Sequence, residues 1–202
     1  MLQDCDIKSD FYQVTINYHV QIAARDGVLL SANLWLPQPR SPGERFPAIL
    51  EMIPYRKDDW RYITDHQRMG YLAQRGYVCC RLDVRGTGSS LGVAYDEYTA
   101  AEIQDGYDVV EWLASQAWSN GNVGMWGISW GGFSAIQVAM LQPPHLKAIV
   151  PMYATDDRYS DDVHYIGGCM VVSEFAQYAA SQIGMNAMPP SPHHFPEDWQ
   201  TL

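Results

Sequence analysis

The chain has 202 residues and a mass of 22.8 kDa, which is more than one average domain of roughly 150 residues and less than two. Hydrophobic residues make up 47% of it and charged residues 18%, and this composition excludes an intrinsically disordered chain. Its 13 Lys and Arg residues and 23 Asp and Glu residues leave a formal net charge of −10, so we expect no nucleic-acid partner.

The predicted elements alternate between strand and helix along the chain. Residues 14–23 alternate apolar and polar side chains, and a second apolar run covers residues 28–37, which predicts an antiparallel hairpin. Buried strands are then predicted at residues 48–53, 77–84, 123–128 and 146–152, and helices at residues 66–75, 102–117 and 131–141. This order predicts an open, doubly wound and mostly parallel α/β sheet.

The end of the chain has a different pattern from the predicted sheet region. Residues 170–185 are helical in pattern, whereas residues 188–202 contain four prolines and have no strand character. We therefore expect residues 1–169 to form part of an α/β domain. Residues 170–202 are expected to form a linker or the start of a helical cap.

No targeting signal or membrane span is evident in the sequence. Residues 1–13 lack a basic stretch followed by an apolar one, and no window approaches ~18 uninterrupted apolar residues. We expect a cytoplasmic protein without a membrane partner. None of the four cysteines has CxxC spacing, and the adjacent Cys79 and Cys80 should point to opposite faces of a strand as reduced packing residues.

The strongest chemical signal lies between the predicted strand at 123–128 and the following helix. Gly127, Ser129 and Gly131 match the G-x-S-x-G pattern of a nucleophile elbow, with Gly132 behind them. Glycines are needed because the serine occupies a crowded turn with positive φ. The sequence therefore predicts Ser129 as a nucleophile and the Trp130 amide, at the start of the helix, as an oxyanion donor. The alternative is a Gly-Ser helix start without chemistry.

Four segments together resemble the cocaine esterase and X-prolyl dipeptidyl peptidase family of α/β-hydrolases. These segments are IPYRK (53–57), DVRGTGSSLG (83–92), WLASQAW (112–118) and GNVGMWGISWGG (121–132), and the resemblance covers roughly residues 10–170. It implies that Ser129 is acylated and that the residue after it, Trp130 where the family usually has Tyr, donates a main-chain hydrogen bond. It also implies a second oxyanion donor, a tyrosine hydroxyl in a Pro-Tyr context, which here is Tyr55.

The residues themselves also place Tyr55 near the predicted site. It follows a predicted parallel strand, where α/β sheets bind their ligands, and a phenol can donate to an alkoxide. The alternative is a loop tyrosine that packs on the sheet edge.

Four aspartates, at positions 156, 157, 161 and 162, follow the predicted strand at 146–152. The resemblance to α-amino-acid ester hydrolases implies that Asp161 and Asp162 bind the ammonium group of a substrate. The alternative is a solvated acidic loop in a chain that is already strongly negative.

No cofactor or metal is predicted. Gly86, Gly88 and Gly92 mimic a dinucleotide loop, but the acidic residues beyond them open a helix instead of ending a strand. The resemblance implies a structural loop there, with Asp83 and Arg85 ion-paired beside the elbow. The spacing of the histidines, including the adjacent pair at 193 and 194, does not suit a metal site.

The acid and base of a catalytic triad are not evident. In this fold they follow the serine on later strands, but only 73 residues follow Ser129 and they contain one clear strand. Neither His164 nor His193 follows a further strand. We therefore expect an N-terminal portion of a larger serine hydrolase, incomplete and inactive alone, without the last strands, most of the cap and a C-terminal jelly roll.

The predicted function is hydrolysis of ester or amide bonds, including X-prolyl dipeptidyl bonds, through an acyl-enzyme on Ser129. Substrates would be small molecules or short peptides. The alternative is a non-catalytic remnant that acts through an exposed sheet edge. Such an edge would also favour self-association.

Overall fold

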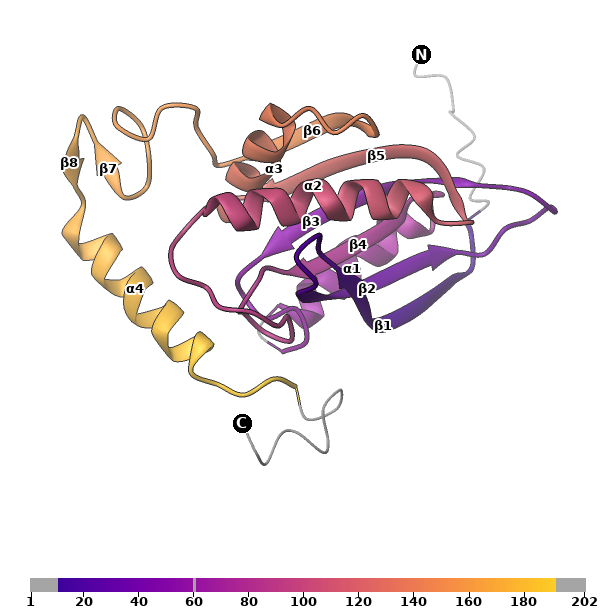
Figure 1. Cartoon of the computed structure of the whole chain (residues 1–202), viewed down its shortest axis with the longest axis horizontal. Helices are drawn as coiled ribbons and strands as arrows, with labels where there is room; N and C mark the ends of the chain where they lie inside the picture. The colour runs from indigo at the N-terminus through magenta and orange to yellow at the C-terminus, as the bar shows by residue number, and fades with distance from the viewer. Residues whose placement is uncertain (1–10, 60, 192–202) are drawn as a thin grey trace, which may run out of the picture.

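The computed structural model describes residues 11–59 and 61–191 and places six strands in one sheet, in the order β1-β2-β4-β3-β5-β6 (Figure 1). The strands are β1 (Val14–Ala23), β2 (Leu29–Pro37), β3 (Phe46–Ile53), β4 (Val78–Asp83), β5 (Ser119–Ile128) and β6 (Leu146–Met152). The helices are α1 (Tyr62–Ala73), α2 (Ala100–Ser115), α3 (Trp130–Met140) and α4 (Val172–Asn186). Cys5, His193 and His194 lie outside the described residues.

The sheet is mostly parallel, as predicted. β1 pairs antiparallel with β2, and β2 with β4, whereas β4, β3, β5 and β6 run parallel to one another. Strand β4 lies on one side of β3, and the chain later crosses over and places β5 on the other side of β3. The strand order therefore reverses between β3 and β5, where open α/β sheets bind ligands beyond the carboxyl ends of their strands.

The two faces of the sheet carry cores of different size. Helices α2 and α3 cover one face, over a large cluster that includes Leu50, Cys80 and Val110, and α1 covers part of the other face, over a small cluster that includes Cys79. Burial raises the pKa of both thiols, so they stay protonated, and Cys79, Cys80 and Cys169 are free. The prediction that Cys79 and Cys80 face opposite sides is confirmed.

Two elements differ at their starts from the prediction. Helix α1 begins at Tyr62 instead of residue 66, and its N-cap residue Arg61 makes no side-chain cap hydrogen bond. The usual capping signal is therefore missing from the sequence. Strand β5 begins at Ser119 instead of residue 123, because the Phe46 amide donates to the Trp118 carbonyl and brings this segment beside β3.

Helix α4 lies beyond the end of the sheet where the parallel strands finish, after a short hairpin of β7 (Tyr165–Ile166) and β8 (Cys169–Met170) (Figure 1). The hairpin was not predicted, because two-residue strands have no readable periodicity. Arg56, in the loop after β3, donates to the Met188 carbonyl at 3.0 Å and the Pro189 carbonyl at 2.7 Å. These bonds fasten the end of α4 to the sheet region. The division at residue 169 stays a prediction.

Candidate active site

Ser129 occupies a tight turn between β5 and α3. Its backbone has φ 56° and ψ −114°, a conformation that an L-residue adopts only when its surroundings enforce it. The Ser129 amide donates to the Met152 carbonyl at 2.8 Å, and the Ser129 carbonyl accepts from the Phe133 amide at 2.9 Å. The structure therefore shows the strained strand-to-helix turn that the glycine pattern predicted.

Crowding around this turn explains its glycines. A Cβ at Gly127 would lie 2.4 Å from the carbonyl carbon of Gly131, so the two glycine backbones pack directly against each other. A Cβ at Gly132 would lie 2.9 Å from the Met152 carbonyl oxygen. Both obstacles are backbone atoms, which cannot move aside as a flexible side chain can.

Trp130 begins α3, so its amide is one of the first N–H groups of a helix and has no partner within that helix. The positive end of the helix dipole lies at the same place. Its indole Nε1 donates to Glu102 Oε1 at 2.6 Å, and its ring lies 4.6 Å from that of Tyr98. The side chain is thus fixed on the buried side of the turn, while the amide is positioned beside Ser129.

Glu102 is a buried carboxylate that sequence reasoning missed. It lies in the first turn of α2 and accepts hydrogen bonds from Trp130 and from Ser134 Oγ at 3.3 Å. Burial raises the pKa of Glu102 to about 7, although both hydrogen bonds favour the charged form. In the sequence it has the position of an ordinary helix-capping glutamate three residues after Thr99, so no pattern linked it to the elbow.

Tyr55 and Ser129 are brought together, because β3 and β5 are neighbouring parallel strands. The Tyr55 hydroxyl lies 3.3 Å from the Tyr178 hydroxyl of α4, and Tyr55 lines one cavity together with Ser129. Burial raises the pKa of the Tyr55 phenol, although the neighbouring Tyr178 and Ser129 hydroxyls act in the opposite direction. Tyr55 therefore keeps its proton at neutral pH and can donate it to an oxyanion.

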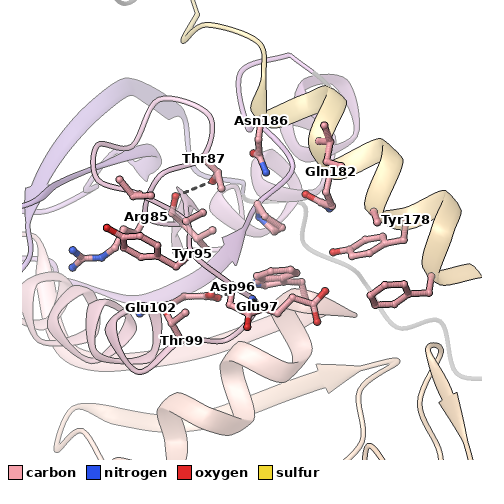
Figure 2. A pocket seen from close by; sticks show the side chains of 18 of the residues that line it. Arg85, Thr87, Tyr95, Asp96, Glu97, Thr99, Glu102, Tyr178, Gln182 and Asn186 are labelled. Carbon is pink, nitrogen blue, oxygen red and sulfur yellow. Dashed lines mark hydrogen bonds between the residues drawn. The ribbon is translucent and has the colours of Figure 1, made fainter. Parts of the chain in front are cut away.

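Two cavities flank this pair of hydroxyls and share a wall. Ser129 and Tyr55 line a cavity of about 280 Å³, and a larger cavity of about 520 Å³ lies on the side of Trp130 and Glu102. Tyr178 and Gln182 line both of them and point from α4 toward the larger one in Figure 2. The site is therefore bounded by the sheet on one side and by α4 on the other.

The larger cavity has an acidic wall that was not predicted. Asp96 and Glu97 line it together with Glu102, as Figure 2 shows. Both belong to an irregular loop between β4 and α2, which has no periodicity from which a direction could be inferred.

Asp161 and Asp162 lie elsewhere. They line a separate cavity of about 270 Å³ together with Phe133 and Tyr153. The Asp162 carboxylate accepts from Arg158 Nε at 2.8 Å. The structure does not bring these aspartates beside Ser129, and their predicted ammonium-binding role stays a prediction.

The predicted ion pair between Asp83 and Arg85 is wrong. Arg85 pairs with Asp26 at 2.7 Å and with Asp105 at 2.6 Å, whereas the buried Asp83 binds Lys57 Nζ at 3.1 Å. Asp83 ends β4 and points into the protein, and the turn that follows directs Arg85 toward α2. Gly88 is confirmed as a structural residue of this loop, because a Cβ there would lie 2.3 Å from Asp83 Oδ2.

Within residues 11–59 and 61–191, no histidine ring hydrogen-bonds to Ser129. His164 is buried and packs against the rings of Phe175, at 5.7 Å, and Tyr178, at 5.0 Å. The same described part of the chain contains no cluster of three or more potential metal ligands. It also contains no helix with the length and apolarity needed to cross a bilayer.

Comparisons with known proteins find a matching family and several relatives. Residues 26–201 match the family described as X-Pro dipeptidyl-peptidase (S15 family). Cocaine esterase from Rhodococcus sp. is 32% identical over 170 residues, which cover 84% of this chain and 28% of that protein. The chain therefore spans little more than a quarter of this relative's length.

Solved structures show the same fold. A CocE/NonD family hydrolase from Staphylococcus aureus superposes with a TM-score of 0.71 at 27% identity, over 86% of this chain and 34% of that one. An α-amino acid ester hydrolase superposes with a TM-score of 0.68 at 24% identity, over 92% of this chain and 34% of that one, and shows likeness of fold alone. Both superpositions agree with the predicted α/β-hydrolase sheet.

Proposed function

Because the chain belongs to the X-Pro dipeptidyl-peptidase (S15) family, we propose that it carries the nucleophile and oxyanion donors of a serine hydrolase that cleaves ester or amide bonds. The observation that carries this proposal is the Ser129 turn, with φ 56° and with Tyr55 lining the same cavity. A buried packing serine would need neither the strained backbone nor a neighbouring phenol.

The proposed reaction is acyl transfer. A general base takes the proton of Ser129, and its oxygen attacks the carbonyl carbon to form a tetrahedral intermediate. The Trp130 N–H and the Tyr55 O–H donate to the negative oxygen, the alcohol or amine leaves with a proton, and water then releases the acid from Ser129. We propose that the triad acid and base come from outside the described residues.

The substrate class proposed is a small ester, an amide or a short peptide with an X-prolyl bond. The family description and the printed name of cocaine esterase support these bond types. An ammonium group on such a substrate would meet carboxylates at Asp96 and Glu97, in the cavity that shares the α4 wall with Ser129.

A second candidate function is association through the sheet edge. Among the described residues, β6 pairs with β5 and with no other strand, and its Val150 side chain is 55% exposed. The neighbouring sheet face holds an apolar cavity of about 470 Å³ that Trp126 and Val150 line. An unpaired edge beside apolar surface supports self-association of this chain.

The proposal is tested by covalent labelling with a fluorophosphonate. We expect the 202-residue chain to be modified at Ser129, at a rate at least about 10³-fold below that of a complete serine hydrolase, because the described residues place no histidine base on Ser129. The measurement is the mass of the Ser129-containing peptide over time, with Ser129→Ala as the control. Absence of any adduct at Ser129 would contradict its role as the nucleophile. Labelling at the rate of a complete enzyme would contradict the proposal that the base lies outside the described residues.

A further inference from the structure

An unpaired cation lines the cavity that contains Ser129. Arg61, the N-cap residue of α1, lines this cavity together with Tyr55 and Ser129. Its Nε is buried and has no hydrogen-bond partner, and among the described residues the Arg61 guanidinium has no ion-pair partner either. A buried polar group without a partner costs about 1–3 kcal/mol, so a protein rarely retains one without a use.

The other charged groups of this cavity already have partners. Arg81 pairs with Glu51 and, through its Nε at 2.8 Å, with Asp65. Burial raises the pKa of Asp65 and of Tyr55, and the positive charge of Arg61 opposes this in both, but Arg61 forms no ion pair with Asp65. The guanidinium of Arg61 is therefore the cation of this cavity that remains available for a ligand.

A second donor without a partner lines the same cavity. The Gln182 side chain extends from α4, and its buried Nε2 makes no hydrogen bond. Arg61 and Gln182 thus line the same cavity from two different elements, the N-cap of α1 and α4. The positive end of the α1 dipole lies at Arg61 as well.

These donors match the chemistry of a carboxylate. A guanidinium binds a carboxylate through two parallel hydrogen bonds, and the amide of a glutamine can donate a further one. A neutral carbonyl has fewer lone pairs and no charge, so it would leave much of the Arg61 donor set unused.

We propose that the substrate carries a carboxylate in addition to the bond that is cleaved, and that Arg61, assisted by Gln182, binds this carboxylate while Ser129 faces the ester or amide carbonyl. This inference deepens the proposed hydrolase function and rests on it. It gives the cavity a selectivity for acidic substrates that the overall charge of −10 would not suggest.

The test uses two ligands that differ by one negative charge. Monomethyl glutarate and dimethyl glutarate have the same chain length and the same methyl ester, and their dissociation constants with the full chain can be measured by titration calorimetry. We expect the monoanion to bind about 10- to 100-fold more tightly, which is the range for a hydrogen bond to a charged group. We expect Arg61→Gln to abolish this preference and Arg61→Lys to retain part of it.

Arg68→Gln is the matched control, because Arg68 lies on the same helix but does not line the cavity. It should keep the preference of the wild-type chain. Thermal unfolding provides a second measurement: monomethyl glutarate should raise the melting temperature of the wild-type chain but not that of Arg61→Gln. Since Arg61 has no ion-pair partner to lose, Arg61→Gln alone should lower the melting temperature only slightly.

Equal affinity for the two esters would overturn the inference, and so would an unchanged preference in Arg61→Gln or an equal loss in Arg68→Gln. The outcome is separable from that of the hydrolase proposal. Ser129→Ala removes the nucleophile but should keep the preference for the monoanion. Normal labelling of Ser129 without any anion preference would reject only the carboxylate site.

Discussion

Gly127→Ala is expected to lower the free energy of unfolding by about 3 kcal/mol and to abolish phosphonylation of Ser129. The new Cβ would lie 2.4 Å from the carbonyl carbon and 2.6 Å from the Cα of Gly131, both on the first turn of α3. Relief requires α3 to move away from β5, and that movement takes Ser129 out of its strained turn. Urea denaturation and the labelling rate at Ser129 measure the two effects.

Gly124→Ala is the matched control on the same strand. Its nearest non-neighbouring atom, the Ala148 carbonyl oxygen, would lie 3.6 Å from the new Cβ, which is an ordinary contact. We expect this variant to change the free energy of unfolding by less than about 1 kcal/mol and to keep the labelling rate. Similar stability losses in the two variants would show that the packing of Gly127 on Gly131 does not maintain the turn.

Tyr55→Phe is expected to slow phosphonylation of Ser129 by about 10²- to 10³-fold, the range found when one oxyanion donor is removed. The substitution keeps the ring and deletes only the hydroxyl, from a residue that lines the cavity of Ser129. The rate is measured at neutral pH, where the phenol of the wild-type chain is protonated.

Tyr178→Phe serves as the control for Tyr55→Phe. The Tyr178 hydroxyl lies 3.3 Å from that of Tyr55, but Tyr178 comes from α4 and does not follow β3 at the carboxyl end of the sheet. We expect its removal to change the rate by less than about tenfold, the effect of one ordinary neutral hydrogen bond. If the two variants slow the reaction equally, Tyr55 acts by supporting α4 and not as an oxyanion donor.

Periodicity and turn chemistry were sufficient to predict the sheet and the elbow. The strand predicted at 146–152 has the bounds of β6. The turn at Ser129 could be predicted because only glycines fit where α3 approaches β5 so closely. These features depend on residues that are neighbours in the sequence, so the sequence alone is sufficient to predict them.

Features that depend on distant contacts could not be predicted in the same way. Glu102 lies 28 residues before its partner Trp130, and Tyr178 lies 123 residues after Tyr55. Among the described residues Arg61 has no ion-pair partner, and the reason depends on a distant contact, because Arg81 forms ion pairs with both Glu51 and Asp65. The error over Asp83 and Arg85 has the same origin, since their true partners come from loops and from α2.

The most direct test of the account is a crystal structure of the chain after reaction with a fluorophosphonate. We expect phosphorus bonded to Ser129 Oγ, with one phosphoryl oxygen about 2.7–3.1 Å from both the Trp130 amide nitrogen and the Tyr55 hydroxyl oxygen. Phosphorus bonded to another residue, or a phosphoryl oxygen that points away from both donors, would contradict Ser129 as the centre of an acyl-transfer site.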